Sequence, residues 1–212
     1  MQFQNPCSVK CENLGFTRGF TPIFSEVSFE VSPGQVLMVR GTNGSGKTSL
    51  LRVLAGFNRA KTGALGFRFG SDDWVDEPTQ HGLGWLGHQN GLSDALNSVE
   101  NLRFWLGSDQ DEADIERVLA TVEMTDLQMQ PVHTLSAGQR RRLGLARLLL
   151  GNHSLWLIDE PGANLDRDGS ALVETLLEQH IKKSGCAIIA SHEKLQPDVP
   201  TSFLTLQTAP AS

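Results

Sequence analysis

The sequence reads Gly41-Thr42-Asn43-Gly44-Ser45-Gly46-Lys47-Thr48 directly after a short apolar run, and this stretch fits the pattern G-x-x-x-x-G-K-[ST]. The run before it, Val36–Val39, is typical of a buried strand. The segment Gly46–Ala55 carries leucines at helical spacing. Glycines let a loop curl so that successive N–H groups point to one place, and a helix N-terminus adds the positive end of its dipole. The stretch therefore predicts a strand, an anion-binding loop and a helix in that order.

The residue types at the end of this loop indicate which anion it binds. Lys47 is placed to reach the β- and γ-phosphates of a nucleotide, and the Thr48 hydroxyl is placed to take a position on Mg²⁺. The alternative is a glycine-rich turn that happens to precede a helix. Such a turn needs neither the lysine nor the hydroxyl residue, so we expect a P-loop nucleotide site.

The rest of the chain alternates between strand and helix signals. Period-two apolar patterns at Ser8–Phe16 and Phe24–Val31 predict strands. Short apolar runs at Gly84–Gly87, Leu155–Ile158 and Ala187–Ala190 predict further buried strands. This alternation indicates an α/β fold.

One region of the chain departs from this alternation of strands and helices. Val99–Leu106 and Glu112–Val122 have helical patterns and no predicted strand near them. Asp166 is expected to cap a later helix that runs to about Ile181. The division that we expect is a single domain, 1–212, with a core of about 1–88 and 132–206 and a helical subdomain of about 89–131.

Composition excludes several classes of protein. The 212 residues include 18 basic and 24 acidic side chains, a formal net charge of −6, so we expect no nucleic-acid partner. No run of 18 apolar residues occurs, which predicts no membrane span, and the first residues lack the features of a secretory signal. The three cysteines are an odd number, which favours a reduced, cytosolic compartment.

Two carboxylates end one of the predicted strands. Asp159 and Glu160 follow the apolar run that starts at Leu155. At the end of a strand beside the P-loop, Asp159 is expected to serve the metal and Glu160 to act as a general base near the γ-phosphate. An apolar run that ends in Asp-Glu is a weak signal on its own, so its interpretation depends on the motifs around it.

A second phosphate-binding surface is predicted before this strand. The stretch Leu135-Ser136-Ala137-Gly138-Gln139 lies immediately ahead of an apolar helix expected over Arg142–Leu150. It combines a serine side chain, a glycine backbone and a helix N-terminus. We expect the run Arg140-Arg141-Arg142 to be a solvated helix face rather than a nucleic-acid contact.

Together these motifs resemble those of the ATP-binding subunits of ABC transporters, whose signature is L-S-G-G-Q. Ala137 departs from that signature at its first glycine, and Gly138 keeps the second. Gln89 matches the Q-loop glutamine, Ala163–Asp166 match the D-loop, and His192 matches the switch histidine. The resemblance implies a P-loop NTPase core of ABC ATPase type, with an N-terminal antiparallel β part and an inserted helical subdomain.

The resemblance also implies the cofactors ATP and Mg²⁺ and a role for each matching residue. The catalytic residues would be Glu160, His192 and Gln89, with His192 and Gln89 as sensors of the γ-phosphate. The Mg²⁺ site would comprise Thr48, Gln89 and Asp159. The nucleotide would be held by Gly41, Thr42, Asn43, Gly44, Ser45, Gly46, Lys47 and Thr48, and on the opposite side by Ser136, Gly138 and Gln139.

Partners follow from the same resemblance. It implies a head-to-tail homodimer in which each ATP lies between Lys47 of one subunit and Ser136 of the other. It also implies an integral membrane permease subunit, which would dock on the helical subdomain and on Gln89–Leu92. The chain would then be a peripheral protein on the cytoplasmic face of the bacterial inner membrane.

Three short stretches of sequence indicate one branch of the family. Trp85–Gln89, Val99–Trp105 and the signature region Leu135–Arg142 are similar to the haem-exporter ATPases of cytochrome c biogenesis. The resemblance implies ATP hydrolysis coupled to haem export or delivery, together with other cytochrome c maturation proteins as partners. It leaves open whether haem itself is the cargo. The alternatives are the ATPase of another ABC exporter, for lipid or lipoprotein, and a soluble ABC ATPase without transport.

The adenine contact is unusual for the family, whose members commonly stack the base on an aromatic residue before the P-loop. The chain has no tyrosine, and the corresponding position holds Arg18, two residues from both Phe16 and Phe20. A guanidinium plane can stack on a base. Either Arg18 or Phe20 is expected to hold the adenine, and the sequence does not choose between them.

Overall fold

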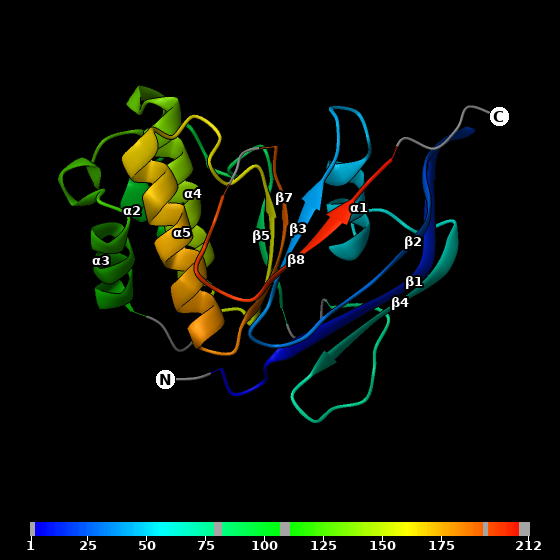
Figure 1. The fold of residues 1–212 in the computed structure, drawn as a ribbon. Helices are drawn as coiled ribbons and strands as arrows, with labels where there is room; N and C mark the ends of the chain where they lie inside the picture. Colours follow the sequence, from blue (N-terminus) through cyan, green and yellow to red (C-terminus); the bar gives the residue numbers. More distant parts are fainter. Residues whose placement is uncertain (1–2, 79–81, 107–110, 193–194, 208–212) are drawn as a thin grey trace.

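The computed structural model describes residues 3–78, 82–106, 111–192 and 195–207. Their strands form two sheets, one of three strands and one of five, with helices on both sides of the larger sheet (Figure 1). The α/β class and the N-terminal antiparallel part predicted from the sequence are confirmed.

The antiparallel sheet has the order β2-β1-β4 and comprises β1 (Cys7–Arg18), β2 (Thr21–Val31) and β4 (Thr62–Phe69). Alternation sends one face inward, so Val9 pairs with Val31 on one side and with Phe67 on the other, and all three side chains are buried. The sequence did not predict β4, because two glycines and an exposed first half weaken its pattern.

The five-stranded sheet is parallel throughout and has the order β5-β6-β7-β3-β8. Its strands are β5 (Gly84–Leu86), β6 (Leu155–Asp159), β7 (Cys186–Ala190), β3 (Val36–Arg40) and β8 (Thr201–Thr205). The inner strands were predicted as apolar runs, which is what burial on both faces requires. The edge strand β8 was not predicted, because its residues are half exposed and partly polar.

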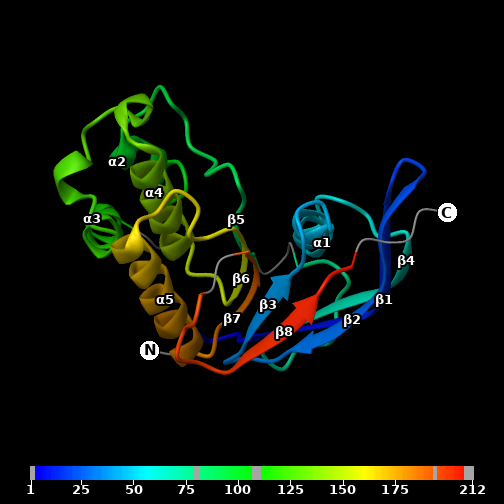
Figure 2. The ribbon, with the colours of Figure 1, turned by 45° about the horizontal axis from the view of Figure 1, so that its top comes forward.

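The sheet separates two cores. Leu37 and Val39 point to the side of α1 (Lys47–Leu54) and the antiparallel sheet, whereas Val36 and Met38 point to the side of α4 (Ala137–Leu150) and α5 (Arg167–Lys182). Figure 2 shows α1 on one side of the parallel sheet and α4 and α5 on the other. The layers therefore place the helix after the P-loop and the helix of the signature on opposite faces.

Short helices pack on the outer side of α4. They are α2 (Ser98–Arg103) and α3 (Glu112–Thr121); the 3₁₀ turn η1 (Thr125–Leu127) contacts α3, and the 3₁₀ turn η2 (Val132–Thr134) precedes α4. Capping boxes begin α2, at Asn97 and Glu100, and α3, at Asp111 and Asp114. Both helices lie where helical patterns were predicted. Within the part of the chain that the structure describes, no helix has both the length and the apolarity to cross a membrane.

Candidate nucleotide site

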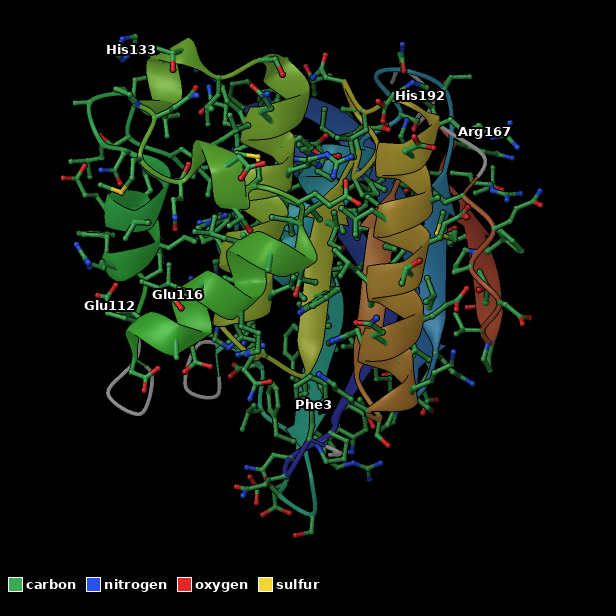
Figure 3. The ribbon with its side chains drawn as sticks, turned by 90° about the vertical axis from the view of Figure 1, so that its left-hand side faces the viewer. Phe3, Glu112, Glu116, His133, Arg167 and His192 are labelled. Atoms are coloured by element: carbon green, nitrogen blue, oxygen red, sulfur yellow. The ribbon has the colours of Figure 1, made fainter. Side chains whose placement is uncertain are left out.

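The candidate site lies where the strands of the parallel sheet end. Because the strands run in one direction, the segments that follow β3, β5, β6 and β7 meet at one edge of the sheet. These segments carry the P-loop, Gln89, the two carboxylates and His192. Figure 3 shows His192 and Arg167 at the same end of the molecule, away from the end where Phe3 lies. The topology thus gathers residues far apart in sequence.

The P-loop between β3 and α1 depends on glycine for conformation and space. Gly41 has φ 151° and Gly46, the N-cap of α1, has φ 98°. A Cβ on Gly41 would lie 2.5 Å from Ser45 Oγ, and one on Gly46 would lie 2.7 Å from Ile23 Cγ2. A side chain at either position would meet both backbone strain and a clash, so the loop has this shape only with glycine.

The polar groups of the loop fit a phosphate. The Lys47 side chain is buried, and its Nζ donates to the main-chain oxygens of Gly41 at 2.8 Å and Thr42 at 3.3 Å. The Ser45 hydroxyl is buried and has no hydrogen-bond partner among the described residues. A buried hydroxyl without a partner is costly, and a phosphate oxygen at this loop would supply one. Thr42, Asn43 and Gly44 form its exposed part.

The start of α1 is joined to the end of β6. Thr48 Oγ1 donates a hydrogen bond of 2.8 Å to Asp159 Oδ2. Burial raises the pKa of Asp159, an effect that the Thr48 hydrogen bond opposes and the neighbouring Glu160 charge reinforces. A hydroxyl and a carboxylate are the hard oxygen donors that suit Mg²⁺. Because no group of three or more His, Cys, Asp or Glu side chains in the described residues could hold a metal, an ion here would need phosphate and water oxygens as well.

The predicted base and the switch histidine are in direct contact. Glu160 Oε2 accepts hydrogen bonds from the His192 main-chain N–H at 3.2 Å and from Ser191 Oγ at 3.3 Å, and lies 2.8 Å from His192 Nδ1. The Glu160 backbone has φ 50°, and its N–H donates to Ala190 O at 2.8 Å. The end of β7 therefore orients the carboxylate. Ser191 was not among the predicted site residues.

The signature forms the first turn of α4 and is not a loop ahead of it. Ser136 is the N-cap: its Oγ accepts from Gln139 N at 3.2 Å, and its own N–H donates to Gln139 Oε1 at 2.8 Å. The helix thus begins at Ala137, and the predicted start at Arg142 was wrong because this capping box extends the helix toward its N-terminus. A Cβ on Gly138 would lie 2.9 Å from Asn164 O, so the turn packs on the D-loop.

The structure does not bring the two phosphate-binding motifs of one chain together. Ser136 and Gly138 stand at the start of α4, on the face of the parallel sheet opposite α1, which begins at Lys47 (Figures 1 and 2). Ser136 is exposed. The two motifs could bind one nucleotide only if a second chain supplied one of them.

Comparison with known proteins agrees with this geometry. Residues 24–163, which include the P-loop, the signature turn and both carboxylates, match the family described as ABC transporter. The chain belongs to the ABC transporter family. It is therefore an ATP-binding subunit that hydrolyses ATP, as the sequence predicted, and the ABC ATPase fold is confirmed.

Curated relatives agree over most of the chain. The chain is similar to several proteins named Cytochrome c biogenesis ATP-binding export protein CcmA. It is 41% identical to that of Mesorhizobium japonicum, over 85% of this chain and 90% of the relative. The protein of this name in Xanthomonas axonopodis pv. citri is 39% identical over 96% of both chains. That in Paracoccus denitrificans is 39% identical over 85% of this chain and 80% of the relative. ABC transporters pair such subunits with a membrane partner.

The two adenine candidates lie on the hairpin between β1 and β2. Arg18 and Phe20 are both exposed, and Phe16 packs against Phe24 with ring centroids 6.0 Å apart. The start of β2 in this hairpin contacts the P-loop, since Ile23 and Phe24 are the neighbours that a side chain on Gly46 would meet. Either candidate is thus on a hairpin that contacts the P-loop, and the choice between them stays a prediction.

One residue of this ABC ATPase was misjudged from its sequence. Arg141 is 2% exposed, whereas a solvated helix face was expected for residues 140–142. The signal was present, because Gly144, Leu145 and Leu148 lie three, four and seven residues further on and are also buried. Arg141 therefore stands on the apolar stripe of α4, and its neighbours Arg140 and Arg142 stand beside it.

Proposed function

We propose that this chain is the ATPase subunit of an export complex for cytochrome c biogenesis, and that it couples ATP hydrolysis to haem export or delivery. The observation that carries the proposal is the arrangement at the strand ends, where the P-loop, the Thr48–Asp159 pair and the Glu160–His192 pair meet. The cytochrome c biogenesis assignment rests on the relatives that bear this name at 39–41% identity over 85–96% of the chain.

Hydrolysis assigns a task to each group. Glu160 accepts the proton of the water that attacks the γ-phosphorus, while His192 and Gln89 sense the γ-phosphate. Lys47 and the N–H groups of the P-loop bind the phosphate oxygens. Thr48, Asp159 and Gln89 would hold Mg²⁺, which when bound neutralises charge on the β- and γ-phosphates.

The second half of each nucleotide site comes from a second copy of the chain. Ser136, Gly138 and Gln139 lie across the sheet from their own P-loop, and Ser136 is exposed at a helix N-terminus. A head-to-tail homodimer would place this turn against the ATP bound at Lys47 of its partner. ATP binding then closes the dimer, and hydrolysis opens it.

The proposed docking surface for the membrane permease subunit is an aromatic ladder beside the Q-loop, which comprises Phe57, Trp85, Phe104 and Trp105 together with Arg147. Phe57 packs edge-on against Trp85 with ring centroids 5.1 Å apart, and Arg147 Nη2 donates to Trp85 O at 2.8 Å. The Arg147 guanidinium lies 4.8 Å from the centre of the Trp105 ring, and Phe104 beside it is 78% exposed. Exposed aromatic side chains in contact with one another mark an interaction surface.

The place of this ladder fits the same partner. It joins the parallel-sheet core to α2, within the helical subdomain that we assign to about 89–131. A Cβ on Gly91 would lie 3.0 Å from Arg147 Nη1, so the ladder touches the Q-loop. A cytoplasmic segment of the permease docked here would sense Gln89 directly, with the chain at the inner face of the bacterial inner membrane.

The proposal is tested in a bacterium from which the gene has been deleted. We expect loss of haem-stained c-type cytochromes, with b-type cytochromes retained. The parent gene should restore them, and a Lys47→Ala gene expressed at the same level should not. Solubilised membranes should yield a membrane subunit with the parent chain, and less with Trp105→Ala. Normal c-type cytochromes in the deletion strain, or a defect confined to lipid or lipoprotein export, would refute the assignment.

A further inference from the structure

Arg141 connects three segments of the candidate site through its guanidinium. Nη2 donates to the main-chain oxygens of Asp159 at 2.6 Å and Glu160 at 2.7 Å, and Nε donates to Pro161 O at 3.2 Å. Nη1 donates to Gly87 O at 2.7 Å and to Asn90 Oδ1 at 2.9 Å. These five acceptors match the five N–H groups of an arginine. One buried side chain thus joins the end of β6 to the Q-loop.

These contacts fall on both sides of the groups that act on ATP. Glu160 has φ 50°, a conformation that a residue with a side chain adopts only when its surroundings hold it there. Arg141 binds the carbonyls before, at and after this strained residue. On the other side it holds Gly87 and Asn90, which flank Gln89.

Removing the buried guanidinium of Arg141 would leave its carbonyl acceptors without their hydrogen-bond donors. Arg141 is 2% exposed, and the carbonyl oxygens around it are turned toward it. Charge-assisted hydrogen bonds are about twice as strong as neutral ones. Without the guanidinium, the turn after β6 and the Q-loop would each keep their own backbone but lose the link that sets the distance between them.

We propose that Arg141 is a positioning residue for ATP hydrolysis, which sets the place of Glu160 and of the Q-loop within its own subunit. This inference rests on the proposed roles of Glu160 and Gln89. Arg141 acts through four main-chain oxygens and the Asn90 side chain, which belong to the turn after β6 and to the Q-loop. Because it belongs to α4, it also fixes these two segments relative to the helix that presents Ser136 to the partner subunit.

The first test separates turnover from binding. Arg141→Met keeps the apolar stem and removes all five donors. We expect kcat for ATP to fall by about 10- to 100-fold, since small misplacements of catalytic groups have effects of this size. The Kd for ATP, measured with a fluorescent analogue, should change less than about threefold, because these five hydrogen bonds hold the turn after β6 and the Q-loop, whereas Lys47 and the P-loop bind the phosphates. Arg142→Met is the matched control: Arg142 binds Val122 O and Glu123, away from the site, and its kcat should stay near the parent value.

A milder variant covers the case in which Arg141→Met does not fold. Asn90→Ala removes one of these five hydrogen bonds and keeps the four to main-chain oxygens. We expect a smaller loss of kcat, with the Tm within a few degrees of the parent. In the double variant the two effects on kcat should be less than additive, because both changes break the same link. A parental kcat in both single variants would overturn the inference.

Mixing variant chains shows in which subunit Arg141 acts. In the dimer, a site uses Lys47 and Glu160 of one chain and Ser136 of the other. Arg141→Met mixed with Ser136→Arg should therefore regain activity, since the second chain keeps an intact Glu160 and receives a normal Ser136. Arg141→Met mixed with Lys47→Ala should gain nothing. Rescue by Lys47→Ala instead would mean that Arg141 acts through Ser136, against the inference. Failure to rescue Ser136→Arg would mean a general loss of structure, also against it.

Two results distinguish a wrong role for Glu160 from a wrong role for Arg141. If Glu160→Gln hydrolyses ATP at the parent rate, the role of Glu160 is wrong whatever Arg141 does. If Glu160→Gln is inactive while Arg141→Met and Asn90→Ala keep the parent kcat, only the positioning role is wrong.

Discussion

Asp159 and Glu160 are adjacent in sequence, yet the side chain of one is buried against Thr48 of α1 and the other reaches the residues after β7. Burial raises the pKa of Asp159, whereas Glu160 is held by Ser191 and His192. Neighbouring carboxylates in different surroundings can serve different chemical steps. At the residue scale, these surroundings support the proposed metal binding by the first and proton transfer by the second.

Replacing Glu160 by glutamine should separate ATP binding from hydrolysis. The amide keeps the size of the side chain but cannot accept the proton, so we expect a loss of turnover of about 100-fold or more. ATP binding should remain, and the variant should accumulate as an ATP-bound dimer in size-exclusion chromatography. Glu116→Gln, an exposed change on α3, is the control and should behave as the parent. Parental turnover in Glu160→Gln would exclude Glu160 as the base.

Replacing Asp159 by asparagine should stabilise the protein while it removes a proposed ligand of Mg²⁺. Because burial raises the pKa of Asp159 in the folded state, the ionised form opposes folding above the unfolded pKa. The Tm gain of Asp159→Asn should be largest near pH 7 and should shrink as the pH falls through the raised pKa, where the native side chain takes up its proton. ATPase activity should be lost. Asp126→Asn, an exposed change, should give no such pH-dependent gain. A lower Tm at pH 7 would contradict the prediction.

The adenine contact should discriminate weakly between bases. A guanidinium or a phenyl ring stacks on any base but reads no exocyclic group. We expect Kd values for ATP and GTP within about tenfold of each other, since one discriminating hydrogen bond contributes about 1 kcal/mol. Either Arg18→Ala or Phe20→Ala should weaken both affinities, and Arg117→Ala on α3 should not. Unchanged affinities in both variants would mean that another segment holds the base.

At the scale of elements, α4 is the part that connects the two halves of the site. Its capping box presents Ser136, its fifth residue is Arg141, and Gly138 lets its first turn approach the D-loop. Its buried stripe packs on the parallel sheet, and α2 and α3 cover its outer side. Any change in the tilt of α4 therefore reaches the signature and the end of β6 together.

Gly138→Ala tests the contact between α4 and the D-loop. Alanine favours a helix, but here its Cβ would lie 2.9 Å from Asn164 O, so the two backbones must separate. We expect the free energy of unfolding to fall by about 1–3 kcal/mol, as for other overpacked sites, and ATPase activity to fall as well. Ala137→Gly changes the neighbouring, exposed position and should leave activity near the parent value. A more stable and fully active Gly138→Ala would show that this contact relaxes freely.

At the scale of the whole molecule, the three-layer arrangement separates the two phosphate-binding motifs of one chain. The P-loop and α1 lie on one face of the parallel sheet, and α4 lies on the other (Figure 2). The separation follows from the alternation of side chains along the central strands, which creates two cores. This packing supports the proposed composite site between two chains.

Subunit mixing tests the composite site. Ser136→Arg should abolish hydrolysis and leave ATP binding by the monomer, whereas Lys47→Ala should weaken binding itself. Equal amounts of the two inactive chains should regain activity, up to about a quarter of the parent value if chains pair at random and half of the pairs hold one intact site. As a control, Ser136→Arg is mixed with Arg117→Ala, a chain that should be active alone. The activity of this mixture shows how much an inactive partner chain lowers the activity of an active one. No regain with dimers present would contradict the shared site.

The sequence alone determined those features that depend on neighbours along the chain. The P-loop, the apolar strands and the capping of α5 at Asp166 rest on turn chemistry, on periodicity and on residues three or four apart, and the structure agrees with each. Roles for the signature and for His192 came from the family resemblance. The weakly patterned strands β4 and β8 were missed, since edge strands need only half of their residues to be apolar.

Only the tertiary structure decided which distant groups meet. The hydrogen bond between Thr48 and Asp159 joins residues 111 positions apart, and those of Arg141 reach 54 positions back to Gly87 and 19 forward to Glu160. No local pattern encodes such pairs, because they depend on the order of strands in the sheet and on how α4 packs against it. In the sequence, a run of three arginines indicates a surface charge. In the folded protein, Arg141 is buried, and the carbonyl oxygens of two loops replace water around its guanidinium.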